Sequence, residues 1–572
     1  MATPHYDENV YRQFNEKLRP LLDGPNVMSM TLDDLRKHAI LSGRKTEHGA
    51  YGWRSMISSR IAPKTVYLGS PDVQLPRPTN QQKDIIEAAP EQLERVLHYM
   101  KTLPFVHLRR RMGDNGEYNP ICNIYVSVND PKNYRIPYMW GNTLFEADNR
   151  PGPKFTMIHI PEEHQMRQQV LTIPEHNLNI CLGSDYMGEE KKGFLRQAMW
   201  RADQQDMLGL HAGTKTVYIW DEHENRMKTI GVFLFGLTAT GKSTWACHQL
   251  GLDETKNERT EVNQDDIVFL RRDGSAYGSE AGFYVKTDVD RDLQEAMYYA
   301  LDDPSALYEN VMIDYTGKRL FLDESLCANG RAIIRRDKLR IKRRNRFINI
   351  DAPSINLPPL DELDGILFAF ITRRNTIMPF SQRLTPEQAV LAYLWGESTH
   401  SYASQPVKAG ESVRIVGTDP FIVGSRAAKV NRFYDIIMQL VEQYPGKVQF
   451  YQYNTGGMGE IIIEYRNGDT IRKRVERNVE RVPIELMAAI QRGDLHGTND
   501  YEPGRLGTEE IIRCASAALN RYDAKRYYTQ EQIEAFVQDI VDGRREFTEQ
   551  IADEGLAPEI MKAAEMSFAV AR

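Results

Sequence analysis

The chain has 572 residues, of which 41% are apolar and 26% charged, a composition typical of an ordinary globular protein. Its formal net charge of −7 argues against a protein that binds nucleic acid through a basic surface. There is no apolar run long enough for a membrane span, and the 5 cysteines include no CxxC pair, so we expect a cytoplasmic protein that binds neither nucleic acid nor membrane.

The expected elements, taken in chain order, alternate between helices and short strands. Apolar spacing predicts helix within residues 1–40 and again from Glu91 to Met100, just after Pro90. Short strands are expected at residues 121–128, 155–160, 178–182, 216–220, 231–235 and 266–270. Helix returns from about residue 530 to the end of the chain. This order predicts an α/β protein with mixed sheets.

The segment GLTATGKST, residues 236–244, follows the apolar run 231–235 and has the phosphate-loop pattern G-x-x-x-x-G-K-[ST]. In such a loop the backbone N–H groups surround the phosphates, Lys242 would reach the β- and γ-phosphates, and the Ser243 hydroxyl would bind Mg²⁺. A helix expected from Ser243 to Leu250 would direct its N-terminus at the phosphates. The residues expected to bind the nucleotide are Gly236, Leu237, Thr238, Ala239, Thr240, Gly241, Lys242, Ser243 and Thr244.

A phosphate loop also needs a carboxylate for its metal ion. Asp265 and Asp266 follow about twenty residues later, at the head of an apolar run. One carboxylate can hold the Mg²⁺ of the nucleotide, and the pair can serve a second metal ion. The alternative interpretation is that the two aspartates cap a helix or form a turn.

Other segments come in a characteristic order around the loop: GSDYMGEEKKGFLRQAM at 183–199, LGLHAGTKTV at 208–217, YGSEAGFYVKTD at 277–288, ALYENVMID at 306–314 and NGRAI at 329–333. Together with the loop they resemble the ATP-dependent phosphoenolpyruvate carboxykinase family, from about residue 40 to 550. The resemblance implies an N-terminal substrate-side domain, expected at residues 1–225, and a P-loop nucleotide-binding domain with C-terminal helices, expected at residues 226–572.

The resemblance also assigns roles to individual side chains. The catalytic residues that it implies are Arg44, Tyr186, Lys192, Lys242 and Arg331. The implied ligands for Mn²⁺ are Lys192, His211 and Asp266, and Ser243 and Asp265 belong to the Mg²⁺ side. Further nucleotide or substrate contacts are implied for Lys286, Glu295 and Arg331. Arg60 competes with Arg44 for the substrate carboxylate, and each of these residues could instead be an ordinary core or surface residue.

The implied reaction converts oxaloacetate and ATP to phosphoenolpyruvate, CO₂ and ADP, as in gluconeogenesis, with Mg²⁺ and Mn²⁺ as cofactors. Three segments depart from the family pattern: those after Arg44, after Asp265–Asp266 and at Arg373–Arg374. The basic run 335–346 could be a solvated face or could hold an anionic substrate or an acidic partner. Two alternatives therefore stay open: a kinase on the same scaffold with another acceptor, and a non-catalytic relative that binds nucleotide. We expect a monomer or a small homo-oligomer.

Overall fold

A computed structural model describes residues 4–56, 61–162, 168–236, 240–323, 325, 329–400, 410–467 and 470–571. The chain forms two compact units. Unit 1 comprises Met1–Gly209, Tyr277–Asn356 and Pro420–Ser425, and unit 2 comprises Leu210–Ala276, Leu357–Asp419 and Arg426–Arg572. These units differ from the single boundary expected between residues 225 and 226, because the segment after Ala276 returns to unit 1. The domain assignment itself stays a prediction.

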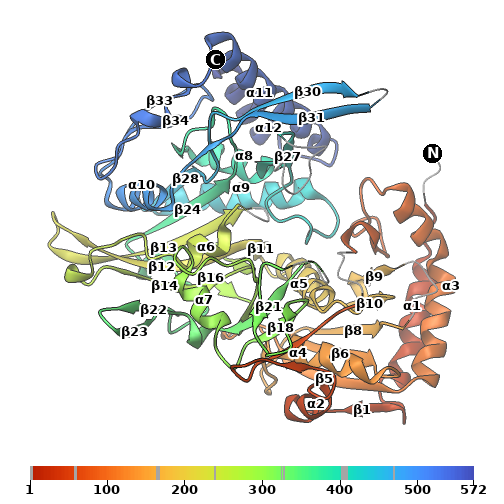
Figure 1. The fold of residues 1–572 in the computed structure, drawn as a ribbon. Coiled ribbons are helices and arrows are strands. Elements are labelled where there is room, and N and C mark those ends of the chain that lie inside the picture. The colour runs from red at the N-terminus through yellow and green to blue at the C-terminus, as the bar shows by residue number, and fades with distance from the viewer. Residues whose placement is uncertain are drawn as a thin grey trace. The chain divides into compact units, whose positions relative to one another are not determined.

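Each unit has six α-helices among its described residues (Figure 1). Those of unit 1 are α1 (Glu8–Leu18), α2 (Leu32–Ala39), α3 (Asn80–Thr102), α4 (Arg135–Gly141), α5 (Gly188–Asp203) and α7 (Glu295–Leu301). Those of unit 2 are α6 (Lys242–Cys247), α8 (Pro386–Trp395), α9 (Arg426–Gln443), α10 (Ile484–His496), α11 (Gln530–Ala552) and α12 (Pro558–Val570). None of these helices is both long and apolar enough to cross a membrane.

Two helix boundaries differ from the sequence prediction. The helix expected to begin at Glu91 begins at Asn80 and runs through Pro90, because Thr79 and Gln82 form a capping box at its start. The helix expected to reach Leu250 ends at Cys247, where the next residue has extended backbone with ψ of 133°. Both errors concern element ends, which are fixed by caps and backbone angles more than by apolar spacing.

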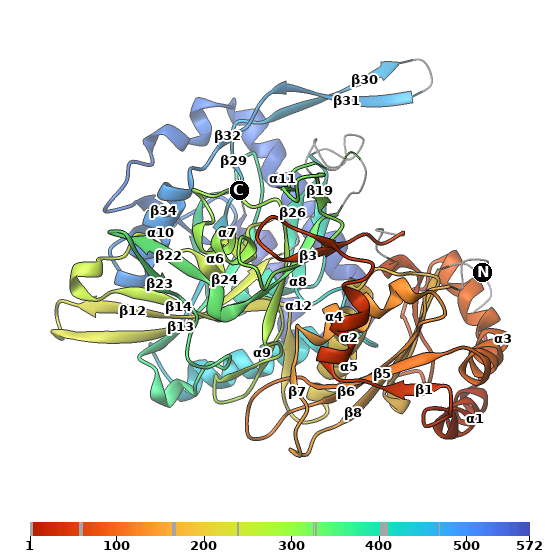
Figure 2. The ribbon, with the colours of Figure 1, turned by 60° about the horizontal axis from the view of Figure 1, so that its bottom comes forward.

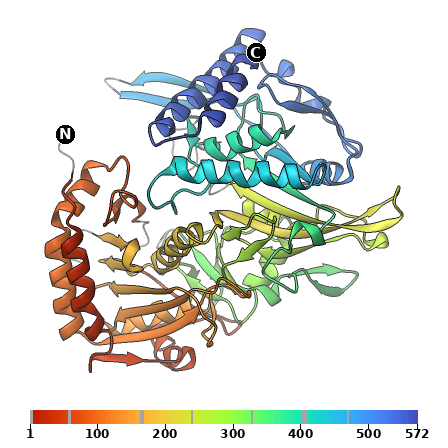
Figure 3. The same cartoon turned by 180° about the vertical axis from the view of Figure 1, so that it is seen from behind.

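The core of unit 1 is an eight-stranded sheet with the order β1-β5-β6-β8-β10-β9-β4 and with β7 paired to β5. Its strands are β1 (Val27–Ser29), β4 (Thr65–Tyr67), β5 (Phe105–Arg111), β6 (Ile121–Ser127), β7 (Phe145–Glu146), β8 (Lys154–Ile160), β9 (Gln169–Ile173) and β10 (Leu178–Leu182). Helices α1 and α3 run along one side of this sheet (Figure 3). Their apolar side chains share one buried cluster with alternate residues of the strands. Helix α5 also packs on β8 and β10.

A second sheet of unit 1 has five strands in the order β17-β21-β18-β3-β2. They are β2 (Arg44–Lys45), β3 (Tyr51–Trp53), β17 (Gly282–Lys286), β18 (Leu307–Glu309) and β21 (Arg331–Arg335). Its strands come from segments far apart in the sequence, so the sheet brings several of the expected substrate-side residues into one structure.

Unit 2 is built on an eight-stranded sheet with the order β14-β12-β13-β24-β28-β25-β34-β33. Its strands are β12 (Ala212–Asp221), β13 (Arg226–Gly236), β14 (Arg259–Gln264), β24 (Gly365–Thr372), β25 (Ser381–Arg383), β28 (Val448–Asn454), β33 (Asp500–Pro503) and β34 (Glu509–Arg513). The central strands β13, β24 and β28 are parallel, so their carboxyl ends meet at one edge. Stacked rings of Phe233, Phe235, Phe368 and Phe370 fill the core beside them.

Short strands complete the described fold. They are β11 (Leu208–Leu210), β15 (Val268–Leu270), β16 (Ala276–Gly278), β19 (Met312–Ile313), β20 (Arg319–Leu320), β22 (Arg340–Arg343), β23 (Arg346–Asn349), β26 (Glu397–Thr399), β27 (Ser412–Arg414), β29 (Gly457–Met458), β30 (Ile461–Asn467), β31 (Thr470–Arg477) and β32 (Glu480–Arg481). The β30–β31 hairpin projects from the rest of unit 2 (Figure 2). The prediction of an α/β protein with mixed sheets is confirmed, as the two large sheets combine parallel and antiparallel pairs.

Candidate active site

The phosphate loop lies at the edge of the unit 2 sheet where the parallel strands end. Strand β13 ends at Gly236 and helix α6 begins at Lys242. Leu237, Thr238 and Ala239 lie outside the described residues. Gly241 has φ of 99°, a left-handed conformation that a residue with a side chain rarely adopts.

The neighbouring strands contribute to the same edge. Thr455, directly after β28, donates its hydroxyl to the carbonyl oxygen of Thr240 at 2.7 Å and its backbone N–H to the carbonyl oxygen of Thr372 at 2.9 Å. The loop, the end of β24 and the end of β28 are thereby joined.

Three of the expected residues of unit 2 are in direct contact. Lys242 Nζ lies 2.8 Å from Asp266 Oδ1, and the same oxygen lies 3.1 Å from His211 Nε2. The reason is topological: β12 and β14 are antiparallel, so the residue before β12 and the residues after β14 come together. The neighbouring Asp265 is buried, while Ser243 and Thr244 at the start of α6 are half-buried.

This donor set fits a divalent metal ion. An imidazole nitrogen and a carboxylate oxygen 3.1 Å apart can both reach one ion at ligand distances of about 2.0–2.2 Å. Imidazole suits transition metals, whereas carboxylate and hydroxyl oxygens also suit Mg²⁺ and Mn²⁺. His211 and Asp266 can therefore hold a transition ion, and Ser243 and Asp265 offer oxygen donors for Mg²⁺.

Lys192 and Tyr186 lie in unit 1, at the start of α5. Lys192 Nζ is 3.0 Å from Glu189 Oε1 and 5.8 Å from the ring centroid of Tyr186. A Cβ on Gly188 would lie 2.5 Å from this ring, so the position of Tyr186 depends on glycine there. The lysine is held by a carboxylate one helical turn earlier and by the face of an aromatic ring.

A buried carboxylate that sequence reasoning missed fixes the turn before α5. Glu309 accepts hydrogen bonds from Arg135 Nη1 at 3.0 Å, from the backbone N–H of Met187 at 3.0 Å and from the Tyr284 hydroxyl at 2.9 Å. Arg135 also contacts Asp185 at 2.8 Å. Burial raises the pKa of Glu309, although Arg135 opposes this shift. Tyr284, Glu309 and Asp185 all stand in the segments that carry the resemblance, but no spacing rule singles them out.

The five-stranded sheet places Lys286, Arg331 and Glu309 next to one another. Arg331 on β21 pairs in register with Lys286 on β17 and with Glu309 on β18. Arg331 is buried, and its guanidinium carbon lies 5.9 Å from the ring centroid of Tyr284. Two of the expected phosphate-side cations thus share one sheet with the carboxylate that binds the backbone N–H of Met187.

Glu295 contacts the basic run of residues 335–346. It is the first residue of α7, and its carboxylate accepts from the Lys342 backbone N–H at 2.8 Å and from Arg343 Nη1 at 3.1 Å. Both donors belong to β22, in the basic run 335–346, which is folded into β21, β22 and β23. The nucleotide contact expected for Glu295 stays a prediction.

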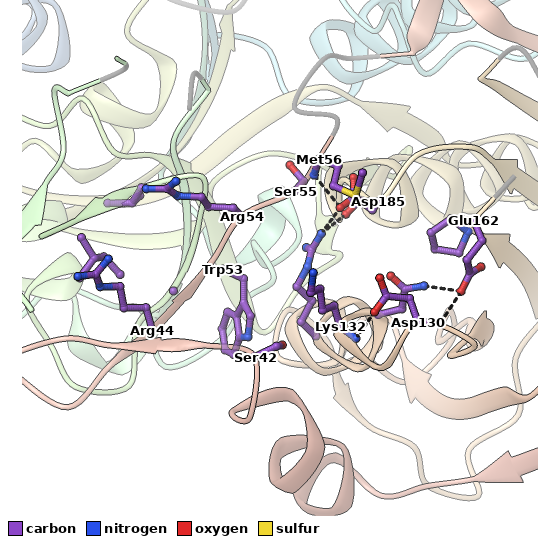
Figure 4. Close-up of a pocket in the computed structure, with 16 residues that line it drawn as sticks. Ser42, Arg44, Trp53, Arg54, Ser55, Met56, Asp130, Lys132, Glu162 and Asp185 are labelled. Atoms are coloured by element: carbon purple, nitrogen blue, oxygen red, sulfur yellow. Dashed lines mark hydrogen bonds and ion pairs between the residues drawn. The ribbon is translucent and has the colours of Figure 1, made fainter. Parts of the chain in front are cut away.

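Arg44 lines a cavity of about 440 Å³ in unit 1 (Figure 4). Arg44 and Arg54 lie on one side of it, and Asp130, Lys132 and Glu162 lie on the other. Arg44 is exposed and donates to the Asp314 carbonyl oxygen at 2.7 Å. Its competitor Arg60 lies outside the described residues. The lining carries both cations and carboxylates, and Arg54 is a cation that the sequence analysis did not name.

Comparison with known proteins decides the family. The family model described as "Phosphoenolpyruvate carboxykinase" matches residues 78–479. The chain belongs to the phosphoenolpyruvate carboxykinase family. The catalytic, metal-binding and nucleotide-binding roles of the residues named above stay predictions.

Individual relatives agree with this assignment. The chain is 30% identical over 361 residues to "Phosphoenolpyruvate carboxykinase (ATP)" of Aeropyrum pernix, over 62% of this chain and 64% of the relative. It is 30% identical over 158 residues to the "Phosphoenolpyruvate carboxykinase (ATP), glycosomal" of Trypanosoma cruzi, over 27% of this chain and 28% of the relative. It is 24% identical over 341 residues to the protein of that name from Trypanosoma brucei brucei, over 56% of this chain and 58% of the relative. Each match spans less than two thirds of the relative.

Proposed function

We propose that the protein is an ATP-dependent phosphoenolpyruvate carboxykinase, which converts oxaloacetate and ATP to phosphoenolpyruvate, CO₂ and ADP. The observation that carries the proposal is the contact of Lys242 and His211 with one oxygen of Asp266, directly beside a phosphate loop. The family assignment supports it, because the relatives are named as the ATP-using enzyme. We further propose a cytoplasmic location and a monomer or small homo-oligomer.

The chemistry divides into two steps. Oxaloacetate loses CO₂, and the electron pair of the broken C–C bond remains as the enolate of pyruvate. The enolate oxygen then attacks the γ-phosphorus of ATP, and the bond to the bridging oxygen breaks to release ADP. Because the enolate is already an anion, the second step needs no general base.

The residues of this chain would then bind and orient the reactants. Lys242 and the backbone of residues 236–244 bind the phosphates, and Arg331 and Lys286 neutralise charge on the transferred phosphoryl group. Arg44 binds a substrate carboxylate, for which the guanidinium fork is suited, and Tyr186 orients the substrate. Lys192, His211 and Asp266 would hold Mn²⁺, and Ser243 with Asp265 would hold Mg²⁺; these ions supply Lewis-acid stabilisation of developing negative charge.

Separate measurements of ATP binding and turnover test these roles. His211→Ala and Lys192→Ala should lower phosphoenolpyruvate formation at least roughly 100-fold, because they remove stabilisation of the transition state. ATP affinity measured by calorimetry should stay nearly unchanged in both variants. Lys242→Ala should lose ATP binding as well as turnover. His223→Ala, which changes an exposed histidine of unit 2, is the matched control and should keep both.

Normal turnover in His211→Ala and Lys192→Ala would refute the assignment of the metal ligands. If the wild-type protein binds ATP and forms no phosphoenolpyruvate, the proposed acceptor is wrong. A kinase for another acceptor would then explain the phosphate loop.

A further inference from the structure

His159 and Cys181 are brought side by side by the register of two parallel strands in unit 1. Cys181 on β10 is the direct partner of His159 on β8. Their neighbours Ile158, Ile160 and Ile180 pack with the helices α1 and α3. Because successive side chains of a strand point to opposite faces, His159 and Cys181 face the other way, toward α5.

Helix α5 adds a carboxylate to this pair. Glu190 lies in the first turn of α5, and its Oε1 is in contact with His159 Nδ1. His159, Cys181 and Glu190 are all fully buried. In the part of the chain that the structure describes, the possible ligand atoms of these three side chains all lie within 4.8 Å of one another.

The hydrogen bond on the far side of the ring defines the state of the histidine. His159 Nε2 contacts the carbonyl oxygen of Ser184. A carbonyl oxygen can only accept, so Nε2 carries the proton and, in a neutral imidazole, Nδ1 presents its lone pair to Glu190. A backbone carbonyl that accepts from the second ring nitrogen is the usual support of a metal-binding histidine.

The ligand atoms of His159 and Glu190 contact each other and little else that is polar. Beyond the contact of His159 Nδ1 with Glu190 Oε1, these two atoms and Glu190 Oε2 have no hydrogen-bond partner among the described residues. A neutral histidine does not compensate the charge of this buried carboxylate, and a buried charge without compensation is strongly destabilising. A lone pair that faces a carboxylate oxygen adds repulsion, unless a proton or a cation lies between the two.

We propose that His159 Nδ1, Cys181 Sγ and the carboxylate of Glu190 bind a zinc ion. A bidentate Glu190 supplies two oxygens, which with one nitrogen and one sulfur complete the four ligands that zinc prefers. One thiolate and one carboxylate balance the 2+ charge of the ion, so the buried centre is neutral. The thiolate favours zinc over Mg²⁺ or Mn²⁺, which prefer oxygen ligands.

The position of the site indicates a structural role. It ties β8, β10 and the first turn of α5 together, and Lys192 lies two residues after Glu190. Since all three ligands are buried, no substrate reaches the ion directly. The zinc ion would fix the start of the helix that carries Lys192, which makes the three ligands positioning residues and separates this site from the proposed catalytic metal ligands.

Metal analysis of the purified full-length protein tests the proposal. The His211→Ala variant is used beside the wild type, so that zinc at the proposed catalytic site does not contribute. After dialysis against a chelator, both proteins should retain about one zinc ion per chain, because a buried structural site releases zinc slowly. Cys181→Ser should lose it. Cys122→Ser, which changes another buried cysteine of the same sheet, should keep it.

Cobalt substitution gives a second readout that does not depend on a variant folding. Wild-type protein loaded with Co²⁺ should show thiolate-to-cobalt charge-transfer absorption, since the proposed catalytic ligands include no cysteine. Wild-type protein that retains no zinc and shows no such absorption would overturn the proposal and leave a protonated His159 paired with Glu190. Equal zinc in Cys181→Ser and Cys122→Ser would overturn it as well.

Discussion

Lys215 is a fully buried lysine beneath the helix of the phosphate loop. It lies on β12, and its Nζ donates to the carbonyl oxygen of Trp245 in α6 at 2.8 Å. Burial lowers its pKa from 10.5 to about 7, and Cys247 opposes this only in part. Replacing it by methionine, a side chain of similar length, removes the charge and the hydrogen bond together.

The pKa difference sets the size and direction of the effect. Between pH 7 and 10.5 the unfolded chain binds a proton that the folded protein does not, so stability rises with pH across this window. At about 1.4 kcal/mol per pK unit, this titration lowers stability by on the order of 5 kcal/mol at pH 6, where the folded protein holds the proton, and by about 2 kcal/mol at pH 9, where folding releases it. Lys215→Met loses the hydrogen bond to Trp245 at every pH but escapes this titration cost, so it should be more stable than the wild type at pH 6, and its advantage should shrink by roughly 3 kcal/mol between pH 6 and 9.

Thermal unfolding of both proteins from pH 6 to 9 measures this advantage. Lys228→Met is the matched control, since Lys228 on the neighbouring β13 pairs with Asp221 and Glu224, which raise its pKa. It stays charged in both states over this range, so its difference from wild type should not change with pH. An advantage of Lys215→Met that is constant or grows with pH would refute the reasoning.

Two further predictions concern unit 2. Burial alone would raise the pKa of Glu397, but Arg544 and Arg374 hold this pKa well below its usual range. Glu397→Gln leaves these buried arginines without their carboxylate, so it should lower the free energy of unfolding by about 3–5 kcal/mol in urea titrations. Glu509→Gln, which loses an exposed pair, should cost about 1 kcal/mol or less, and equal losses would contradict the first prediction. Gly241→Ala forces a side chain into a left-handed conformation at φ 99° and should weaken ATP binding roughly 5- to 100-fold by calorimetry, whereas unchanged affinity would show that this conformation is not needed.

Features set by local chemistry could be predicted from the sequence. The strands around residues 121–128, 155–160, 178–182 and 231–235 are present, because apolar runs of that length have few other structures open to them. The phosphate loop lies between a strand and a helix, as its pattern requires. Lys242 and Asp266 meet, since β13 and β14 both run antiparallel to β12 between them, so the residues after β13 and after β14 lie at one edge of the sheet.

Features set by contacts between distant segments could not be predicted. Glu309 is surrounded by Arg135, Met187 and Tyr284, which come from three separate elements. The pairing of His159 with Cys181 depends on the strand register, which follows from the packing of the whole sheet. The start of α3 was missed because the capping box at Thr79 outweighs the proline inside the helix.

The most direct test of the proposed function is the steady-state conversion of oxaloacetate by the wild-type protein with ATP, Mg²⁺ and Mn²⁺ present together. A parallel reaction contains GTP in place of ATP. We predict that phosphoenolpyruvate, CO₂ and ADP form in equal amounts with ATP. We also predict that phosphoenolpyruvate forms faster with ATP than with GTP. ATP binding without any phosphoenolpyruvate would contradict the account, because the phosphate loop would then serve a different acceptor.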